Sequence, residues 1–249
     1  MDLGLTGKVA IVTGGSRGIG RAIARELALE GVDVAICARQ RQALDEAAKA
    51  LSQETGRRII PIVADTMSSE SVAQLVKSTV AALGRVDVLV NNASTPGGMV
   101  RGPLADADDK TLLEDIDTKV VGYLRCAKAV APHMQQRKWG RIINIGGLSG
   151  RRSGNISGLR NAAVVHLTKT LADELGAHGI TVNLVHPGAT RTERTDAETE
   201  RRAASNAIRR IVDASEIAQV VAFLASMKAA NVTGVAIDAS GGSIPVMFQ

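Results

Sequence analysis

The sequence predicts an α/β fold in which helices cover both faces of a parallel β-sheet. Short apolar runs alternate with amphipathic helical patterns along all 249 residues, and this alternation is typical of repeated βα units. Hydrophobic residues make up 45% of the chain, but the only aromatic residues are Phe223, Phe248, Trp139 and Tyr123. The core therefore consists mainly of Ala, Val, Ile and Leu, as in buried parallel sheets. No linker-like stretch divides the pattern, which predicts a single domain over residues 1–249.

Seven apolar runs are candidates for the strands of this sheet. Most of them are continuous rather than alternating, which indicates strands that are buried on both faces. They cover residues 8–14, 32–39, 58–65, 86–93, 141–147, 181–188 and 234–240. Helical patterns such as "GRAIARELALEG" and "SVAQLVKSTVAALG" lie between them and end at Gly, the residue best suited to a left-handed cap.

The charge is unevenly distributed along the chain. Residues 137–210 contain 13 Lys or Arg and 6 Asp or Glu, in a chain whose net charge is +5. This block is either a solvated face or a surface that attracts an anionic ligand. A nucleic-acid partner is not expected, because the basic residues alternate with strand cores and few aromatic residues are available for base stacking. Residues 189–212 are the least regular segment and are predicted to form a flap on the substrate side.

Cysteine spacing and hydropathy argue against several other classes of protein. Cys37 and Cys126 lie 89 positions apart in apolar segments, which is neither a metal-ligand spacing nor a disulfide framework, so no metal site is predicted. A strand-like run begins after seven residues, which leaves no room for a signal peptide. No apolar run approaches the ~20 residues that span a bilayer. We therefore expect a cytoplasmic protein with no membrane partner.

A glycine-rich loop, "TGGSRGIG" at residues 13–20, joins the first predicted strand to the first predicted helix. Its glycines allow a sharp turn and allow a pyrophosphate to approach the positive end of the helix. Many strand–helix turns are rich in glycine, but a position directly after the first strand of a βα series favours nucleotide binding. The candidate cofactor-binding residues of this loop are Gly14, Ser16, Arg17, Gly18, Ile19 and Gly20.

The end of the second predicted strand indicates which dinucleotide binds. An acidic residue at this point accepts hydrogen bonds from the ribose of NAD, but here the strand ends with Ala38 and Arg39. Arg39 and Arg17 together favour a 2′-phosphate, and therefore NADP as the cofactor. The alternative is that Arg39 is only a surface charge at the start of a helix.

The chain resembles the short-chain dehydrogenase/reductase family, and within it the ketoacyl-reductase-like branch, over about residues 6–242. The motifs that support the resemblance are "TGGSRGIG", "NNAS" at 91–94, "GRIINIGG" at 140–147, "GITVNLVHPG" at 179–188 and the closing "TGVAIDASGG". The resemblance implies a single-domain, Rossmann-like, doubly wound fold with a seven-stranded parallel sheet, and a homo-oligomer, either a dimer or a tetramer.

The resemblance also assigns cofactor contacts outside the glycine loop. It places the adenine at Asp65 and Thr66, the adenosine side at Asn92 and Ala93, and the nicotinamide end at Pro187, Gly188 and Thr192. Two of the motifs deviate from the family pattern. Ser94 stands where the family has Gly, and Ser240 stands where it has Asp.

The four positions that perform the family's chemistry are all substituted. Hydride transfer to a carbonyl creates an alkoxide that must receive a proton, and the family uses a Tyr whose pKa is lowered by a Lys one helical turn away. Ungapped counting places Ser157 at the Tyr position, Asn161 at the Lys position, Gly147 at the Ser position and Lys119 at the Asn position. Ser149 follows two residues after Gly147, and no tyrosine occurs between residues 124 and 249.

Other side chains are candidates for the missing groups. Tyr123 follows Lys119 by four residues, so the two share a helical face, although Tyr123 is also expected to pack in a helix interface. Ser157 and Asn161 are expected to hydrogen-bond to each other. His186 is either a proton donor or a strand-end residue bound to a backbone carbonyl, and the pattern around His166 predicts a core residue. The candidate catalytic residues are Lys119, Tyr123, Ser157 and Asn161.

These observations leave three functions open. The first is an NADP-dependent oxidoreductase with an atypical site that acts on a small carbonyl or hydroxyl compound carrying an acidic group. Five arginines are expected around its mouth, namely Arg151, Arg152, Arg160, Arg191 and Arg194. The second is a cofactor-binding protein without turnover, and the third is a non-redox lyase or isomerase. If only side chains are missing, Ser157→Tyr, Asn161→Lys and Gly147→Ser together are predicted to create carbonyl reductase activity.

Overall fold

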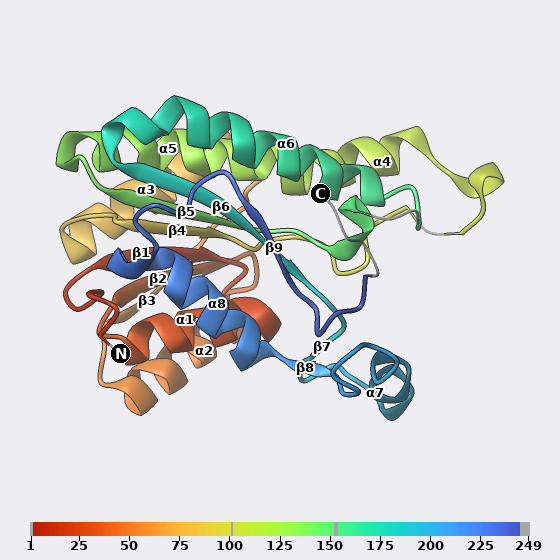
Figure 1. Ribbon diagram of the computed structural model, residues 1–249. Helices are drawn as coiled ribbons and strands as arrows, with labels where there is room; N and C mark the ends of the chain where they lie inside the picture. Colours follow the sequence, from red (N-terminus) through yellow and green to blue (C-terminus); the bar gives the residue numbers. More distant parts are fainter. Residues whose placement is uncertain (1, 101, 152–153, 245–249) are drawn as a thin grey trace.

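The fold is built on seven parallel strands in the order β3-β2-β1-β4-β5-β6-β9 (Figure 1). It is seen in a computed structural model that describes residues 2–100, 102–151 and 154–244. The strands are β1 (Val9–Thr13), β2 (Asp33–Ala38), β3 (Ile59–Val63), β4 (Val88–Asn91), β5 (Gly140–Ile145), β6 (Ile180–Pro187) and β9 (Ala236–Ala239). Each lies within or overlaps one of the seven predicted runs, so the predicted α/β fold is confirmed.

Helices cover both faces of the sheet (Figure 1). One layer contains α1, α2 and α8, and the other contains α3, α5 and α6, as the two large clusters of buried apolar residues show. The helices are α1 (Gly18–Leu29), α2 (Arg41–Thr55), α3 (Ser69–Leu83), α4 (Asp109–Ile116), α5 (Gly122–Arg137), α6 (Gly158–Leu175), α7 (Ala197–Ala203) and α8 (Ala214–Ala225). A π-helical turn, Asp117–Val121, joins α4 to α5.

Short segments complete the architecture at the ends of the strands. Turns of 3-10 helix occur at Leu104–Asp106, Leu148–Gly150, Gly176–His178 and Met227–Ala229. Outside the main sheet, β7 (Thr190–Arg191) pairs in parallel with β8 (Val212–Asp213). β7 and α7 lie within the segment predicted to form a flap, and β8 begins at its last residue. Figure 1 shows α7 projecting away from the sheet.

Continuous apolar runs explain why the central strands are buried on both faces. All five residues of β1 and all six of β5 are buried. Most of their side chains are apolar, and the buried Arg141 and Asn144 of β5 are hydrogen-bonded. Glycine ends the helices as expected. Gly84 caps α3 with a φ of 83°, a left-handed conformation that glycine adopts without steric cost.

The strand order determines where a ligand binds. The chain runs outward from β1 in one direction through β2 and β3, and then in the other direction through β4, β5 and β6. In open parallel sheets, the crevice beyond the carboxyl ends of the strands at such a reversal is the usual binding site. The loops that follow β1, β4, β5 and β6 therefore meet at one edge, and they contain most of the predicted site residues.

Two searches of the described residues gave negative results. No helix among them is long and apolar enough to cross a bilayer. No group of three or more His, Cys, Asp or Glu side chains among them is arranged to hold a metal ion.

Candidate functional site

Two glycines of the loop after β1 occupy positions where no side chain fits. Gly14 has a φ of +68°, and an added Cβ would lie 2.8 Å from the side-chain nitrogen of Asn92. At Gly20, an added Cβ would lie 2.3 Å from the carbonyl oxygen of Gly14. The first turn of α1 therefore packs directly against the backbone of the loop, and this contact keeps its amide groups directed at the crevice.

Asn92, just after the neighbouring strand β4, and Thr13, the last residue of β1, hold the glycine loop in place. The hydroxyl oxygen of Thr13 accepts hydrogen bonds from the backbone amides of Asn92 at 2.9 Å and Ala93 at 3.0 Å. The Asn92 side chain donates to the carbonyl oxygens of Thr13 at 2.9 Å and Gly14 at 3.3 Å. Asn92 thus supports the loop. Thr13, which was not among the candidate cofactor-binding residues, anchors the backbone of Asn92 in return.

The turn after β7 lies against the start of α1. The backbone amide of Gly18 donates a hydrogen bond of 3.2 Å to a carboxylate oxygen of Glu193. An added Cβ at Gly18 would lie 3.6 Å from Thr192 and 4.0 Å from the guanidinium of Arg194. Glu193 therefore places a negative charge at the helix N-terminus to which a pyrophosphate would bind. Sequence reasoning missed this residue, because its contact with Gly18 joins segments 175 positions apart.

The two arginines expected at a 2′-phosphate are available for it. Arg17 and Arg39 are exposed, and neither forms an ion pair with any other residue in the described ranges. Asp65 is half-buried and accepts a hydrogen bond from the amide of Met67 at 3.0 Å, while Thr66 is buried. Two unpaired guanidinium groups beside a glycine loop with no room for side chains fit a phosphorylated dinucleotide.

The opposite side of the crevice contains a buried cation. The π-helical turn directs Lys119 at the end of β5, where its ammonium group donates to the carbonyl oxygen of Gly146 at 2.9 Å and to Asn161 Oδ1 at 2.8 Å. Only 2% of Lys119 is exposed. Burial, with a smaller contribution from the nearby Arg160, lowers the pKa of Lys119 to about 7. Single π-helical turns are frequent at functional sites.

Asn161 connects this cation to a hydroxyl group. Its Nδ2 atom donates to the Ser149 hydroxyl oxygen at 2.8 Å, so Lys119, Asn161 and Ser149 form a continuous chain of hydrogen bonds. Gly147 leaves the room that Asn161 needs, since an added Cβ there would lie 2.8 Å from the same Nδ2 atom. Lys119, Gly147 and Asn161 are therefore compatible with one another in space.

Ser157 lies apart from this chain. Its hydroxyl accepts a hydrogen bond from the amide of Val100 at 2.9 Å and donates to the carbonyl oxygen of Val100 at 3.3 Å. The expected hydrogen bond between Ser157 and Asn161 is therefore wrong. Gly98 passes so close that an added Cβ on it would lie 2.2 Å from Ser157 Cβ. The backbone of the 97–100 loop occupies the space that a larger side chain at 157 would need.

A buried ion pair holds that loop over the start of α6. Arg160 pairs with Asp115 of α4 at 2.5 Å and also donates to the carbonyl oxygen of Thr95 at 2.8 Å. The second carboxylate oxygen of Asp115 accepts from the amide of Met99 at 3.1 Å. Because both charged groups are buried, removing either would leave the other without its partner, at a high cost in stability.

Tyr123 has a packing role in the structure. It is 1% exposed, and its hydroxyl donates to the carbonyl oxygen of Ile145 at 3.0 Å. Burial raises the pKa of Tyr123 above its ordinary value. Lys119 does share a face with it, at 5.9 Å from the ring centre, but the tyrosine proton is already donated to the backbone.

The two histidines differ from their expected environments. His186 is fully buried, and its Nδ1 accepts a hydrogen bond from the amide of Gly147 at 3.0 Å. Its backbone partner is therefore an amide and not a carbonyl. Burial lowers the pKa of His186 to about 4, so the ring is neutral at pH 7. His166, expected in the core, is exposed on α6, because the apolar face of that helix turns away from it.

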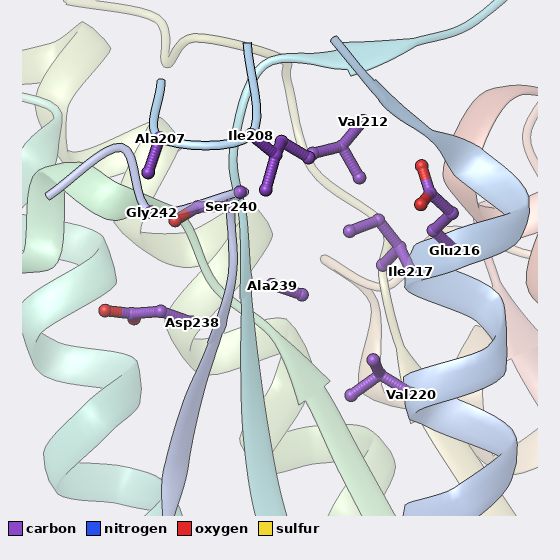
Figure 2. A pocket seen from close by; sticks show the side chains of 11 residues that line it. Ala207, Ile208, Val212, Glu216, Ile217, Val220, Asp238, Ala239, Ser240 and Gly242 are labelled. Carbon is purple, nitrogen blue, oxygen red and sulfur yellow. The ribbon is translucent and has the colours of Figure 1, made fainter. Parts of the chain in front are cut away.

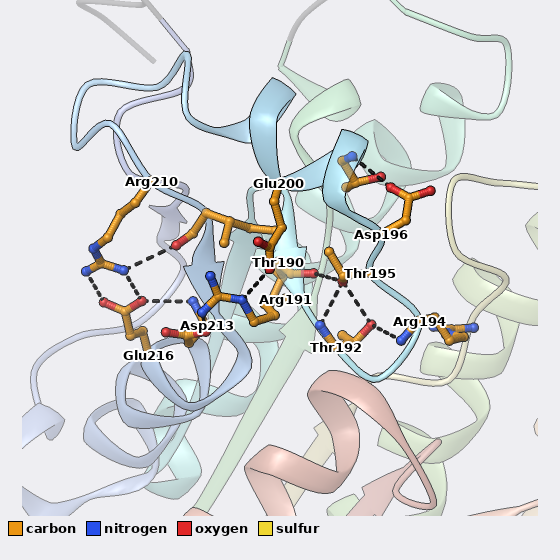
Figure 3. A network of polar contacts seen from close by, with 12 residues as sticks. Thr190, Arg191, Thr192, Arg194, Thr195, Asp196, Glu200, Arg210, Asp213 and Glu216 are labelled. Carbon is orange, nitrogen blue, oxygen red and sulfur yellow. Dashed lines mark hydrogen bonds and ion pairs between the residues drawn. The ribbon is translucent and has the colours of Figure 1, made fainter.

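Most arginines expected around the mouth have acidic partners. Arg160 is buried on Asp115, Arg151 pairs with Asp238 at 2.9 Å, and Arg191 pairs with Glu200 and Asp213, each at 2.7 Å. Figure 3 shows the Arg191 network together with the turn at Thr192–Thr195. Arg152 lies outside the described residues. Three of the five arginines are thus neutralised within the protein, and Arg194 lies at the cofactor loop.

A pocket of about 480 Å³ lies between the flap and the sheet (Figure 2). Side chains of the flap, of α8 and of the end of β9 line it, among them Ile208, Ile217 and Ser240. Neither Lys119 nor Asn161 belongs to its lining. The pocket is therefore separate from the chain of hydrogen bonds at the end of β5.

Comparison with known proteins finds similarity over nearly the whole chain. A family model of short chain dehydrogenases matches residues 8–203. The 3-oxoacyl-acyl-carrier-protein reductase FabG of Haemophilus influenzae is 37% identical over 248 residues, covering 96% of this chain and 98% of that protein. L-Sorbose reductase from Gluconobacter frateurii, solved with NADPH and L-sorbose, has a TM-score of 0.92 at 30% identity, covering 99% and 100% of the two chains. An NAD⁺-bound xylitol dehydrogenase has a TM-score of 0.87 at 30% identity, covering 96% of this chain and 99% of the other.

Proposed function

The chain belongs to the short-chain dehydrogenase/reductase family, and we propose that it is an NADP(H)-dependent oxidoreductase that interconverts a carbonyl and a hydroxyl group in a small molecule. The observation on which the proposal depends most is the buried Lys119–Asn161 contact, 2.8 Å long, at the end of β5. A buried cation costs folding free energy, and perturbed titratable groups cluster at functional sites.

The residues proposed to hold the cofactor surround the glycine loop. The amides at the start of α1 face the pyrophosphate, and Arg17 and Arg39 pair with the 2′-phosphate. Asp65, Thr66, Asn92 and Ala93 border the adenosine half, and Pro187, Gly188 and Thr192 border the nicotinamide half. When it is bound, NADPH supplies the hydride that adds to the carbonyl carbon. The protein supplies orientation and stabilises the charge that develops on the substrate oxygen.

The proposed source of positive charge near that oxygen is Lys119, which Asn161 holds in place. Both hydroxyl groups of the other candidates, Ser157 and Tyr123, are bound to backbone atoms, which supports a structural role for them. The cation that the family provides from position 161 comes here from position 119. Both arrangements place a positive charge beside the end of the same strand.

The proposed substrate is a small ketone or the corresponding alcohol. The relatives compared here are named for 3-oxoacyl thioesters, L-sorbose and xylitol, so ketones and polyols are the compounds to test. An acidic group on the substrate has less support, because Arg151, Arg160 and Arg191 are paired internally. We further propose a single domain with a flap over residues 189–212, assembled as a homodimer or homotetramer.

Deuterium transfer tests the proposal directly. The protein is incubated with NADPH labelled with deuterium at C4 and with ketones that carry thioester, hydroxyl or carboxylate groups, and the alcohols are analysed by mass spectrometry. Stereospecific incorporation of deuterium into one of them supports the oxidoreductase. Tight binding of NADPH without transfer to any ketone would instead support a cofactor-binding protein, a reading favoured by the 97–100 loop that occupies the space beside Ser157.

A further inference from the structure

Resting on the proposed oxidoreductase function, we infer that Ser149 is the catalytic hydroxyl that contacts the substrate oxygen, and that Asn161 and Lys119 are positioning residues that act through it. The inference begins from the direction of the hydrogen bonds. Asn161 Nδ2 donates to Ser149 at 2.8 Å, and Lys119 donates to Asn161 Oδ1 at 2.8 Å. Both donors point toward Ser149, so the chain ends at its hydroxyl oxygen.

Exposure distinguishes Ser149 from the other two members of the chain. Lys119 is 2% exposed and Asn161 is 5% exposed, whereas Ser149 is partly exposed. The Ser149 hydroxyl accepts one hydrogen bond, and within the described ranges no residue accepts its proton. A hydroxyl that accepts a bond and keeps its own proton available is suited to donate to a ligand.

The buried charge strengthens that donor. An ammonium group at the amide oxygen of Asn161 polarises the amide and makes its Nδ2 a stronger donor. The Ser149 hydroxyl that accepts this bond becomes a stronger donor in turn, and hydrogen bonds aligned in one direction reinforce each other. The carbonyl oxygen of Gly146, at 2.9 Å, fixes the position of the ammonium group.

Gly147 and Gly158 keep this arrangement open. A side chain at 147 would strike Asn161, as described above, and an added Cβ at Gly158 would lie 2.9 Å from the Ser149 carbonyl oxygen. The hydroxyl expected at 147 and the cation expected at 161 are both displaced. They reappear at 149 and 119 as one connected set, which supports a single relocated site.

The chemical step balances with the groups named. When bound, NADPH would supply the hydride for the new C–H bond from its C4–H bond and leave as NADP⁺, and the electron pair of the carbonyl π bond would move to the substrate oxygen. Ser149 donates a hydrogen bond to that oxygen as its negative charge develops. A water molecule supplies the proton that completes the alcohol. Bulk solvent then returns a proton to that water. Ser149 is therefore unchanged at the end of the reaction, and Lys119 keeps its proton.

The test compares Ser149→Ala with Ser157→Ala, which removes a hydroxyl eight positions away whose bonds are to Val100. Ser149→Ala is expected to lower kcat by about 10²–10³-fold, as for the loss of one oxyanion donor. Ser157→Ala is expected to change kcat little. Ser149→Thr keeps a hydroxyl and is expected to recover most of the loss. Titration of each variant with NADPH shows whether its cofactor site is intact.

A second measurement does not depend on turnover. The ¹⁵N signal of the Asn161 side-chain amide should move in Ser149→Ala and stay in place in Ser157→Ala. Equal kcat values for Ser149→Ala and the unmodified protein would overturn the inference and leave the proposed function intact. An unmoved Asn161 signal in Ser149→Ala would also overturn it. Absence of deuterium transfer by the unmodified protein would overturn both.

Discussion

The two sides of the crevice differ in what builds them: backbone contacts on the cofactor side, and polar side chains on the opposite side. On the cofactor side, Gly14, Gly20 and Asn92 form the close contacts of the glycine loop, and Arg17 and Arg39 are exposed. On the opposite side, the residue types expected at 119, 147 and 161 have all changed, yet a cation and a hydroxyl are still connected there through Asn161. We infer from this difference that backbone-based binding depends on its motif, whereas a polar side-chain network can be built from other positions.

The physical reason lies in what each side must present. A pyrophosphate is bound by backbone amides at a helix N-terminus, and these need glycine at fixed positions. A developing alkoxide needs a donor and a positive charge within reach, and several side chains can deliver them from different elements. Here the donors come from the π-helical turn, from the loop after β5 and from α6.

The largest expected effect is a loss of NADPH affinity when the packing of the glycine loop is disrupted. Gly20→Val would force carbon atoms into the Gly14 carbonyl oxygen, which lies 2.3 Å from an ideal Cβ. We expect the loop to shift, at a cost of about 3 kcal/mol or more, and NADPH affinity to fall by more than about 100-fold. Gly176→Ala is the matched control, because nothing lies within 4 Å of its Cβ. Unchanged affinity in Gly20→Val, measured by fluorescence titration, would contradict the fit.

The opposite side is tested by removing its charge. Lys119→Met is expected to lower kcat by between about 10-fold and 100-fold, less than the loss of a direct donor. Because the pKa of Lys119 is lowered to about 7, the ammonium form dominates only below that pH. The kcat of the unmodified protein should therefore fall as pH rises past about 7, and the Met variant should lose this dependence. Lys169→Met, an exposed change on α6, is the control. If kcat of Lys119→Met falls with pH as it does in the unmodified protein, the pH dependence does not come from Lys119.

Restoring the family residues is expected to damage this side. The triple variant Ser157→Tyr, Asn161→Lys and Gly147→Ser was predicted from the sequence to gain activity, but the structure leaves no space for it. Gly98 closes the position beside Ser157, and a lysine at 161 would face Lys119. Overpacking of this kind costs about 1–3 kcal/mol, which calorimetry detects as a fall in Tm. A gain of activity at unchanged Tm would show that the 97–100 loop moves aside readily.

A smaller effect is expected on the preference for NADP over NAD. If Arg39 and Arg17 bind a 2′-phosphate, NADP binds at least about tenfold more tightly than NAD, or about 1.4 kcal/mol. Arg39→Asp should reverse that order by repelling the phosphate and accepting hydrogen bonds from the ribose. The control is Arg41→Ala, because Arg41 already pairs with Asp45. This variant should keep the preference for NADP. Equal affinities of the unmodified protein for both dinucleotides would end this assignment.

The smallest effect is expected at the flap. Glu193 places its carboxylate at the amide of Gly18, where it competes with a pyrophosphate for the positive end of α1. Glu193→Gln removes the charge, and helix-end interactions of about 0.3–1 kcal/mol predict that NADPH binds about two- to fivefold more tightly. Glu198→Gln, on the same flap, should leave the affinity unchanged. Weaker binding in Glu193→Gln would mean that the carboxylate supports the bound cofactor.

The fold could be predicted from the sequence alone, and the glycine loop could be recognised in it. Hydrophobic periodicity predicted all seven strands of the sheet, because strands buried on both faces require continuous apolar runs. The glycine loop and Arg39 could be recognised because their roles depend on local backbone conformation and on position after a strand. Such features depend only on residues that are consecutive in the chain, so a sequence pattern can reveal them.

The contacts around Lys119 could be identified only in the tertiary structure. The partners of Lys119 and Asn161 lie 27, 42 and 12 positions away along the chain, and no local pattern indicates which of them meet. The sequence therefore paired Ser157 with Asn161, and it did not select Ser149 or Glu193. Only the packing of α6 against the end of β5 shows that Asn161 turns to Ser149, and only the closure of the 97–100 loop shows why position 157 has no room for a tyrosine. Contacts between distant segments depend on the completed fold, because each element must first be placed by the core that holds it.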